Sequence, residues 1–116
     1  MLWAKSQLPT SQEERFALVV AEFFNNPDVT PPSGTGFGSA GLRVHGRIFA
    51  MLSSKREFVV KLPARRVDAL IAAGEGDRYD PGHGRRMKEW LALSPTSQLD
   101  WLSLAREALA FVADQR

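Results

Sequence analysis

The stretch from residue 37 to residue 62, FGSAGLRVHGRIFAMLSSKREFVVKL, constrains the fold of this chain most strongly. It contains a glycine-rich entry followed by three short apolar runs, and short polar segments separate those runs. Apolar runs of roughly four to eight residues bounded by turn residues are typical of β-strands. The stretch therefore predicts an antiparallel sheet whose successive strands are joined by tight turns.

The first strand and its turn can be placed by residue. Leu42 and Val44 alternate with Arg43, which is typical of a strand that buries one face. His45 and Gly46 then predict a two-residue hairpin turn, because glycine accepts a positive φ and histidine tolerates one.

Three further strands are predicted. Residues 48–52 form a continuous apolar run, which favours a central strand covered on both faces. Residues 53–56 predict a polar turn, and residues 58–62 alternate as a third antiparallel strand. Residues 87–93, which include Trp90, predict a fourth strand, although the run also fits a helix.

A first helix is predicted over residues 10–25. Ser11, with Glu14 three residues later, fits a capping box, and residues 25–27 end the helix. Apolar residues recur at helical spacing and predict its buried stripe: Phe16, Val19, Val20, Phe23 and Phe24.

Two more helices are predicted. The second begins at Pro63, whose missing N–H is tolerated at a first helical position, and Gly74 stops it after Ala73. Its apolar face consists of Val67, Leu70 and Ile71. The last helix begins at Ser97 as the cap, with Asp100 three residues on. Its buried face is predicted to consist of Trp101, Leu102, Ala105, Leu109 and Val112.

The predicted fold class is therefore α+β. Residues 27–41 and 74–86 are rich in glycine and predict two long loops. We expect an antiparallel sheet of three to four strands, arranged as a meander, with N-terminal, middle and C-terminal helices packed on one face. The length of 116 residues predicts one domain over residues 1–116, with residues 1–9 as a flexible tail.

Composition excludes several classes of protein. The chain has no cysteine, which excludes disulfides, thiol catalysis and zinc ribbons, and a reducing cytoplasm is the expected location. No apolar run approaches the roughly 20 residues that cross a bilayer, so no membrane association is expected. Residues 1–10 lack the basic flank and apolar centre of a secretory signal.

One glycine motif resembles a cofactor site. Residues 36–41 match G-x-G-x-x-G, but a dinucleotide site needs that motif between a strand and a helix. Here a proline-rich segment precedes the motif and a predicted strand follows it. We therefore expect no cofactor and interpret these glycines as the entry to the sheet.

The two histidines give no clear metal site. His45 is interpreted as a turn residue, and His83 lies in the second glycine-rich loop beside Asp80. No dense spacing of ligand residues is visible, so no metal is expected. As an alternative, His83 is a candidate anion ligand or general base.

The charge distribution is asymmetric. From Arg43 to Lys88 there are eleven Lys/Arg and five Asp/Glu, a balance of +6, whereas the rest of the chain has four and eight, a balance of −4. Clustered arginines grip phosphates, and tyrosine can stack on a base. The candidate residues for binding nucleic acid or another anion are Lys61, Arg65, Arg66, Arg78, Tyr79, His83, Arg85, Arg86 and Lys88.

The pattern resembles the N-terminal domain of the TfoX family and the related MmcQ/YjbR group. The resemblance covers about residues 11–113, and its motifs are mostly glycines and core apolar positions. They are Phe37-Gly38, Gly41-Leu42, Gly46-Arg47-Ile48-Phe49-Ala50, Val60-Lys61-Leu62 and Met87-Lys88-Glu89-Trp90. The resemblance implies a small bacterial α+β domain. The first family takes its name from competence regulators, and the second is often labelled DNA-binding.

These observations predict a non-enzymatic binding domain that takes nucleic acid through its basic residues. One alternative is a protein-interaction module or homodimer, which would use an edge strand or residues 27–41. A second alternative is an enzyme that acts on an anionic small molecule with His83.

Overall fold

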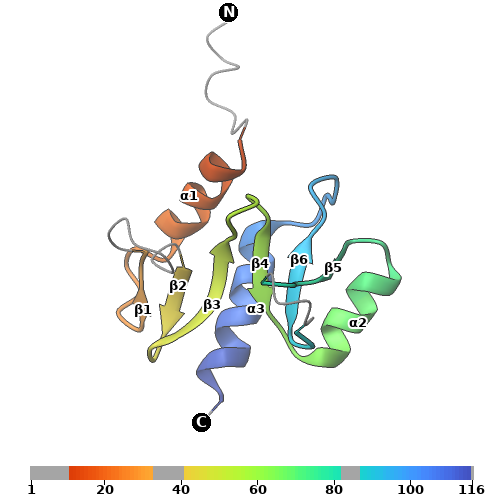
Figure 1. Ribbon diagram of the computed structural model, residues 1–116. Helices are drawn as coiled ribbons and strands as arrows, with labels where there is room; N and C mark the ends of the chain where they lie inside the picture. The colour runs from red at the N-terminus through yellow and green to blue at the C-terminus, as the bar shows by residue number, and fades with distance from the viewer. Residues whose placement is uncertain (1–10, 33–40, 82–86, 116) are drawn as a thin grey trace, which may run out of the picture.

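The fold is α+β, and the described part of the chain forms three helices and a six-stranded antiparallel sheet (Figure 1). The computed structural model describes residues 11–32, 41–81 and 87–115. The flexible tail expected at residues 1–9, most of the 36–41 glycine motif, and His83, Arg85 and Arg86 lie outside these residues. No helix in the described part of the chain is long and apolar enough to cross a membrane.

The strands follow the order β1-β2-β3-β4-β6-β5. In chain order the elements are α1 (Gln12–Glu22), β1 (Val29–Thr30), β2 (Gly41–Val44), β3 (Arg47–Leu52), β4 (Phe58–Lys61), α2 (Ala64–Ala72), β5 (Gly76–Arg78), β6 (Trp90–Leu93) and α3 (Trp101–Ala113). The four predicted strands correspond to β2, β3, β4 and β6, which are neighbours in this order, and β2, β3 and β4 form a meander. Two strands were missed. β1 and β5 lie in the segments predicted as loops, and two or three residues are too short for an alternation signal.

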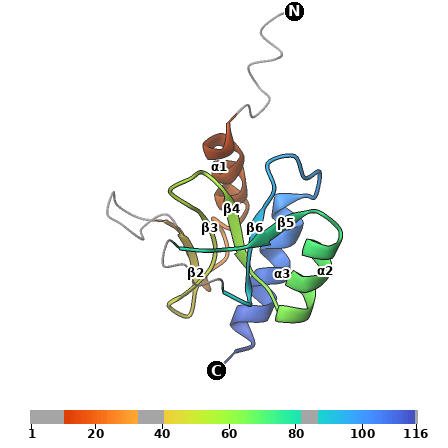
Figure 2. The same cartoon turned by 45° about the vertical axis from the view of Figure 1, so that its right-hand side comes forward.

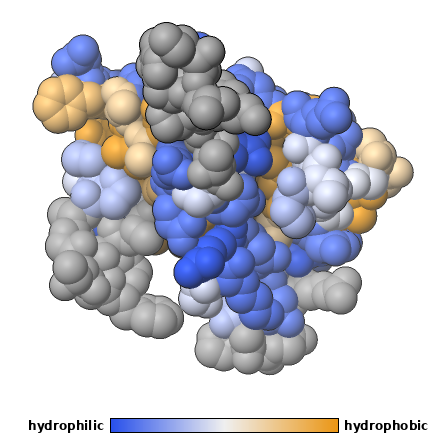
Figure 3. All heavy atoms as spheres, turned by 90° about the horizontal axis from the view of Figure 1, so that it is seen from above, coloured by the Kyte–Doolittle hydropathy of each residue, from blue (hydrophilic) through white to orange (hydrophobic). Residues whose placement is uncertain are grey.

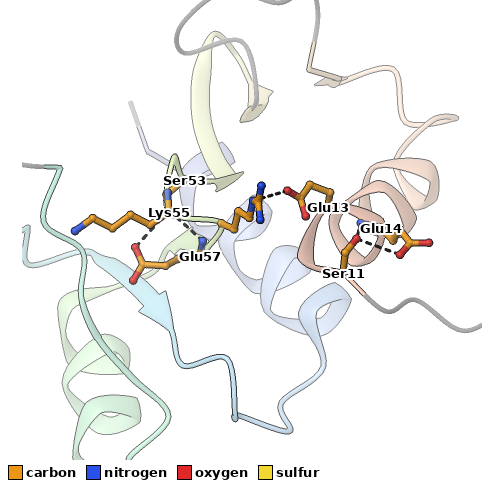
Figure 4. Close-up of polar contacts among 7 residues, drawn as sticks. Ser11, Glu13, Glu14, Ser53, Lys55 and Glu57 are labelled. Atoms are coloured by element: carbon orange, nitrogen blue, oxygen red, sulfur yellow. Dashed lines mark hydrogen bonds and ion pairs between the residues drawn. The ribbon is translucent and has the colours of Figure 1, made fainter.

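The start of α1 was predicted correctly and its end was not. The Ser11 hydroxyl accepts the Glu14 N–H at 3.1 Å and donates to the Glu14 carboxylate at 3.1 Å, so Ser11 is confirmed as the N-cap and Glu14 as its side-chain partner (Figure 4). The helix ends at Glu22, and Phe23, its C-cap, is buried. Phe24 was predicted in the buried stripe, but it follows the cap and is 81% exposed.

The β2–β3 hairpin has the predicted turn and an unpredicted bulge. His45 and Gly46 both have positive φ, at 53° and 79°. The register shifts within the pair, so Phe49 is an extra residue between Ile48 and Ala50. Phe49 and Ala50 both join the core on the helix side. The bulge thus places two consecutive apolar residues of the 48–52 run in the core. The prediction that this strand is buried on both faces was wrong, since Ile48 is only half-buried.

One core lies between the sheet and the helices. Phe58, Val60 and Leu62 from β4 and its end contribute to it, as do side chains from all three helices. The core residues from the helices are Phe16, Val19, Phe23, Val67, Leu70, Trp101, Leu104, Ala105, Ala108 and Val112. The three helices therefore share one side of the sheet, as predicted, while Ile71, Leu102 and Leu109 are only partly buried around this core.

The ends of α2 and α3 follow local hydrogen bonds. Gly74 has φ 80° and donates its N–H to Ile71 at 2.9 Å, which confirms the predicted stop of α2. The cap of α3 is Asp100, whose carboxylate accepts the Ser103 N–H at 3.0 Å. Ser97 was predicted as the cap, but its hydroxyl bonds to Glu75 and to the Leu99 N–H within the preceding turn.

Candidate nucleic-acid interface

The face of the sheet opposite the core carries a lysine beside a tryptophan. Val60 and Leu91 point into the core, so their chain neighbours Lys61 and Trp90 point to the opposite face. Lys61 and Trp90 are direct partners in the β4–β6 ladder. The Lys61 Nζ lies 5.8 Å from the centroid of the Trp90 ring, within the range of a cation–π contact.

The Trp90 backbone is held from several directions. Its carbonyl oxygen accepts the Tyr79 N–H at 2.8 Å, and its own N–H donates to Met87 at 3.2 Å. The Glu89 carbonyl oxygen before it accepts the Leu62 N–H at 2.9 Å. These bonds hold the backbone of the half-buried Trp90 in regular structure at the start of β6, opposite the end of β4.

Tyr79 follows β5 and lies close to the turn between β3 and β4. In Figures 1 and 2 the chain after β5 passes in front of β4. A hollow of about 50 Å³ separates the two segments, and its lining residues are Ser53, Ser54, Lys55, Glu57, Tyr79, Asp80 and Pro81. Burial raises the pKa of the Tyr79 phenol, and the carboxylates of Glu57 and Asp80 raise it further. The phenol is therefore a neutral hydrogen-bonding and stacking group.

The β3–β4 turn is itself ordered by Ser53. The Ser53 hydroxyl accepts the N–H groups of Lys55 and Glu57, at 3.2 and 3.1 Å, and donates to the Glu57 carboxylate at 3.3 Å (Figure 4). Arg56 has φ 65° and forms an ion pair with Glu13 at 2.7 Å. This turn lies at the opposite end of β4 from Lys61.

Two of the predicted arginines are neutralised by neighbouring acids. Arg66 forms a two-pronged ion pair with Glu107 of α3, at 3.0 and 3.1 Å. Arg78 forms an ion pair with Asp68 of α2. Both pairs tie α2 to its neighbours, so the structure gives these two arginines a structural role.

Three predicted cations remain near one end of the sheet. Lys61 ends β4, Lys88 lies two residues before Trp90, and Arg65 lies in the first turn of α2. Arg65 and Lys88 are exposed, and neither has an ion-pair partner among the described residues. His83, Arg85 and Arg86 lie outside the described residues. We call Lys61, Arg65, Lys88 and Trp90 the basic end of the sheet.

Trp90 was not among the predicted site residues. Its strand was predicted, and alternation with the apolar Leu91 and Leu93 is the signal that places Trp90 on the other face. Its pairing with Lys61 depends on the register between β4 and β6, two strands that α2 and β5 separate in the chain. No local pattern carries that information.

The side chains at the basic end of the sheet are cations and an aromatic ring, which are suited to binding a ligand. The described residues contain no group of three or more His, Cys, Asp or Glu side chains placed to hold a metal ion. Comparison with protein-family models, with curated proteins and with solved structures found no match to this chain.

Proposed function

We propose that this domain is a non-enzymatic binding protein that takes single-stranded nucleic acid at the basic end of the sheet. The main support for the proposal is that Lys61 pairs with Trp90 on the face of the sheet opposite the core and the helices. Sheet faces that carry aromatic and basic side chains bind single strands, because bases stack on rings while cations meet phosphates.

The geometry favours a single strand over a duplex. Trp90 lies on a strand, half-buried beside neighbouring backbone, so its ring can receive an unpaired base but cannot enter a groove. Lys61, the strand partner of Trp90, and the exposed Lys88, two residues before Trp90, are the cations proposed to contact phosphates next to that base. Arg65, exposed in the first turn of α2, is a further cation that follows Lys61 closely in the chain.

The neutralised arginines limit the affinity. With Arg66 and Arg78 in ion pairs, three of the predicted cations within the described residues remain for phosphate contacts: Lys61, Arg65 and Lys88. For three phosphate contacts on a single strand, the logarithm of the binding constant falls with the logarithm of salt concentration with a slope of about −2. The proposal is therefore a modest, salt-sensitive and sequence-tolerant interaction.

The test compares two charge-matched variants. Fluorescence anisotropy of a labelled single-stranded oligonucleotide is measured at low salt with wild type, with Lys61→Gln/Lys88→Gln, and with Lys55→Gln/Arg56→Gln. All variants lose the same charge, but the control pair lies in the turn at the far end of β4. We expect about tenfold weaker binding for the first variant and little change for the control. Equal losses in both would contradict a defined interface.

Stacking is tested separately from charge. Trp90→Ala removes the ring and is expected to weaken binding about tenfold, as loss of one stacked base does, whereas Trp90→Phe retains most of the affinity. A thermal melt of each variant shows whether the sheet is intact. Tighter binding of a duplex than of a single strand would overturn the single-strand assignment.

A further inference from the structure

The exposed side of α1 carries an apolar patch beside the exposed acidic residues Glu13, Glu14 and Glu22. Ala17, Leu18 and Ala21 are exposed on this helix, and Phe24 follows its end. Leu18 is 57% exposed and Phe24 is 81% exposed. Figure 3 shows hydrophobic surface on the left, the side on which α1 and β1 lie in Figure 1. This face lies away from Lys61 and Trp90 and plays no part in the proposed nucleic-acid interface.

A groove borders the same face. It has a volume of about 430 Å³ and lies between α1 and the start of α3. Its lining residues are Arg15, Leu18, Val19, Ala21, Glu22, Asp100, Trp101 and Leu102. Leu18 and Ala21 thus belong both to the groove and to the exposed face, while Arg15 and Glu22 carry opposite charges along its edge.

We propose that a second copy of this chain covers this face, through antiparallel pairing of α1 with its symmetry mate. A two-fold axis midway between Val19 and Val20 brings Leu18 of one copy opposite Ala21 of the other. The same axis places Phe24 of one copy two residues, about 3 Å along the axis, from Ala17 of the other. Each large side chain meets a small one, which lets two helices pack closely in an isologous contact.

The charges are self-complementary under the same symmetry. Arg15 and Glu22 lie on one side of α1, about two helical turns apart. In the antiparallel pair, Arg15 of one copy is displaced along the axis by two residues, about 3 Å, from Glu22 of the other. Both side chains are long enough to close that gap, and the symmetry makes the ion pair twice.

Arg15 and Glu22 have only weak contacts within one copy, which leaves them able to form ion pairs with the second copy. The Arg15 guanidinium carbon lies over the Trp101 ring, 4.2 Å from its centroid. Glu22 lies 3.8 Å from Arg106, with both side chains more than half exposed. Arg15 can keep its place over Trp101 and still direct N–H groups toward a carboxylate of the second copy.

The area of the exposed apolar face of α1 limits the expected affinity of the dimer. A pair of helices of this length buries less than the roughly 1,200 Å² typical of stable complexes, so the dissociation constant is on the order of 10 µM or weaker. Sedimentation velocity over a concentration series across this range should show monomers converting to dimers. A monomer at every concentration would overturn the proposal.

Exposed apolar residues provide matched variants. Leu18→Lys and Phe24→Lys each place a charge in the paired face and are expected to weaken dimerisation at least tenfold. Met87 is another exposed hydrophobic residue, 41% exposed, and it lies outside α1. Met87→Lys should therefore leave dimerisation unchanged. Equal effects of the three substitutions would contradict the assignment of the interface to α1.

A charge-swap experiment tests the symmetry itself. Arg15→Glu alone and Glu22→Arg alone each place like charges opposite one another and should remain monomeric. A mixture of the two variants should form a one-to-one heterodimer, because every cross-pair then has opposite charges. Failure of the mixture to associate, with wild type dimeric, would exclude the antiparallel α1 arrangement. Lys61→Gln/Lys88→Gln should dimerise normally, which separates this result from the nucleic-acid proposal.

Discussion

Trp101 of α3 stacks on Phe58 of β4, with the ring centroids 4.4 Å apart and the planes 4° from parallel. The guanidinium of Arg15 lies over the same indole, and Phe16 lies 6.1 Å from Phe58. This stack joins α1, α3 and the centre of the sheet. It also forms one wall of the groove beside α1, so its integrity matters for the core and for the surface above it.

Trp101→Ala should therefore lower the free energy of unfolding by about 3–5 kcal/mol, since it removes a buried aromatic ring and leaves a cavity. Equilibrium urea unfolding, followed by circular dichroism, measures this loss. Arg15→Ala serves as the control, with an expected loss of about 0.5–1 kcal/mol from the cation–π contact. A loss below about 1 kcal/mol for Trp101→Ala would show that the stack is not part of the stabilising core.

Tyr79 is the single tyrosine of the chain, so its ionisation can be followed directly by tyrosinate absorbance. Its pKa is raised above the ordinary 10.0 by burial and by the carboxylates of Glu57 and Asp80. We expect the folded protein to titrate above pH 10, and Glu57→Gln to lower the midpoint. Since the folded pKa is the higher one, the contribution to stability is complete below pH 10 and is lost as pH rises through the folded pKa. A midpoint below 10 would contradict the described environment.

Gly76 is required where β5 meets β6. A Cβ at this position would collide with the Ala92 carbonyl oxygen and lie 3.1 Å from the Leu93 Cα. Both are backbone atoms of a central strand and cannot give way easily. Gly76→Ala should cost about 1–3 kcal/mol and loosen the edge strand. Faster amide hydrogen exchange at Arg78 and Tyr79 would accompany this loss, and an unchanged melting temperature would argue against the close contact.

Arg56 adopts a left-handed conformation, with φ 65°, at the last position of the β3–β4 turn. A side chain costs about 1–2 kcal/mol in that region, and glycine does not pay it. The ion pair to Glu13 offsets little of this cost, since the Arg56 and Glu13 side chains are 71% and 51% exposed. Arg56→Gly should therefore raise the free energy of unfolding by about 0.5–1 kcal/mol. Destabilisation by thermal melt would show that the ion pair dominates.

Local signals in the sequence predicted the local features well. The N-cap at Ser11, the turn at His45 and Gly46, and the stop at Gly74 depend on residues within a few positions of one another. The α+β class followed from the alternating runs around them. Features that depend on distant partners were missed, namely the short strands β1 and β5, which exist because β2 and β6 pair with them.

The candidate site shows the same limit. Charge clustering along the chain selected Arg66 and Arg78, but Glu107 and Asp68 neutralise them from α3 and α2. Conversely, Trp90 became a candidate site residue only because the β4–β6 register places it opposite Lys61. Phe24 continued the apolar spacing of α1 but lies beyond its end, because the helix stops at Glu22.

The most direct test of the central claim is the salt dependence of binding to a labelled single-stranded oligonucleotide. Anisotropy titrations of the wild-type protein, at several salt concentrations, give the logarithmic slope. The basic end of the sheet predicts binding at low salt with a slope of about −2, corresponding to three phosphate contacts. No binding at low salt, or binding that does not depend on salt, would contradict the assignment of Lys61, Arg65, Lys88 and Trp90 as a nucleic-acid interface.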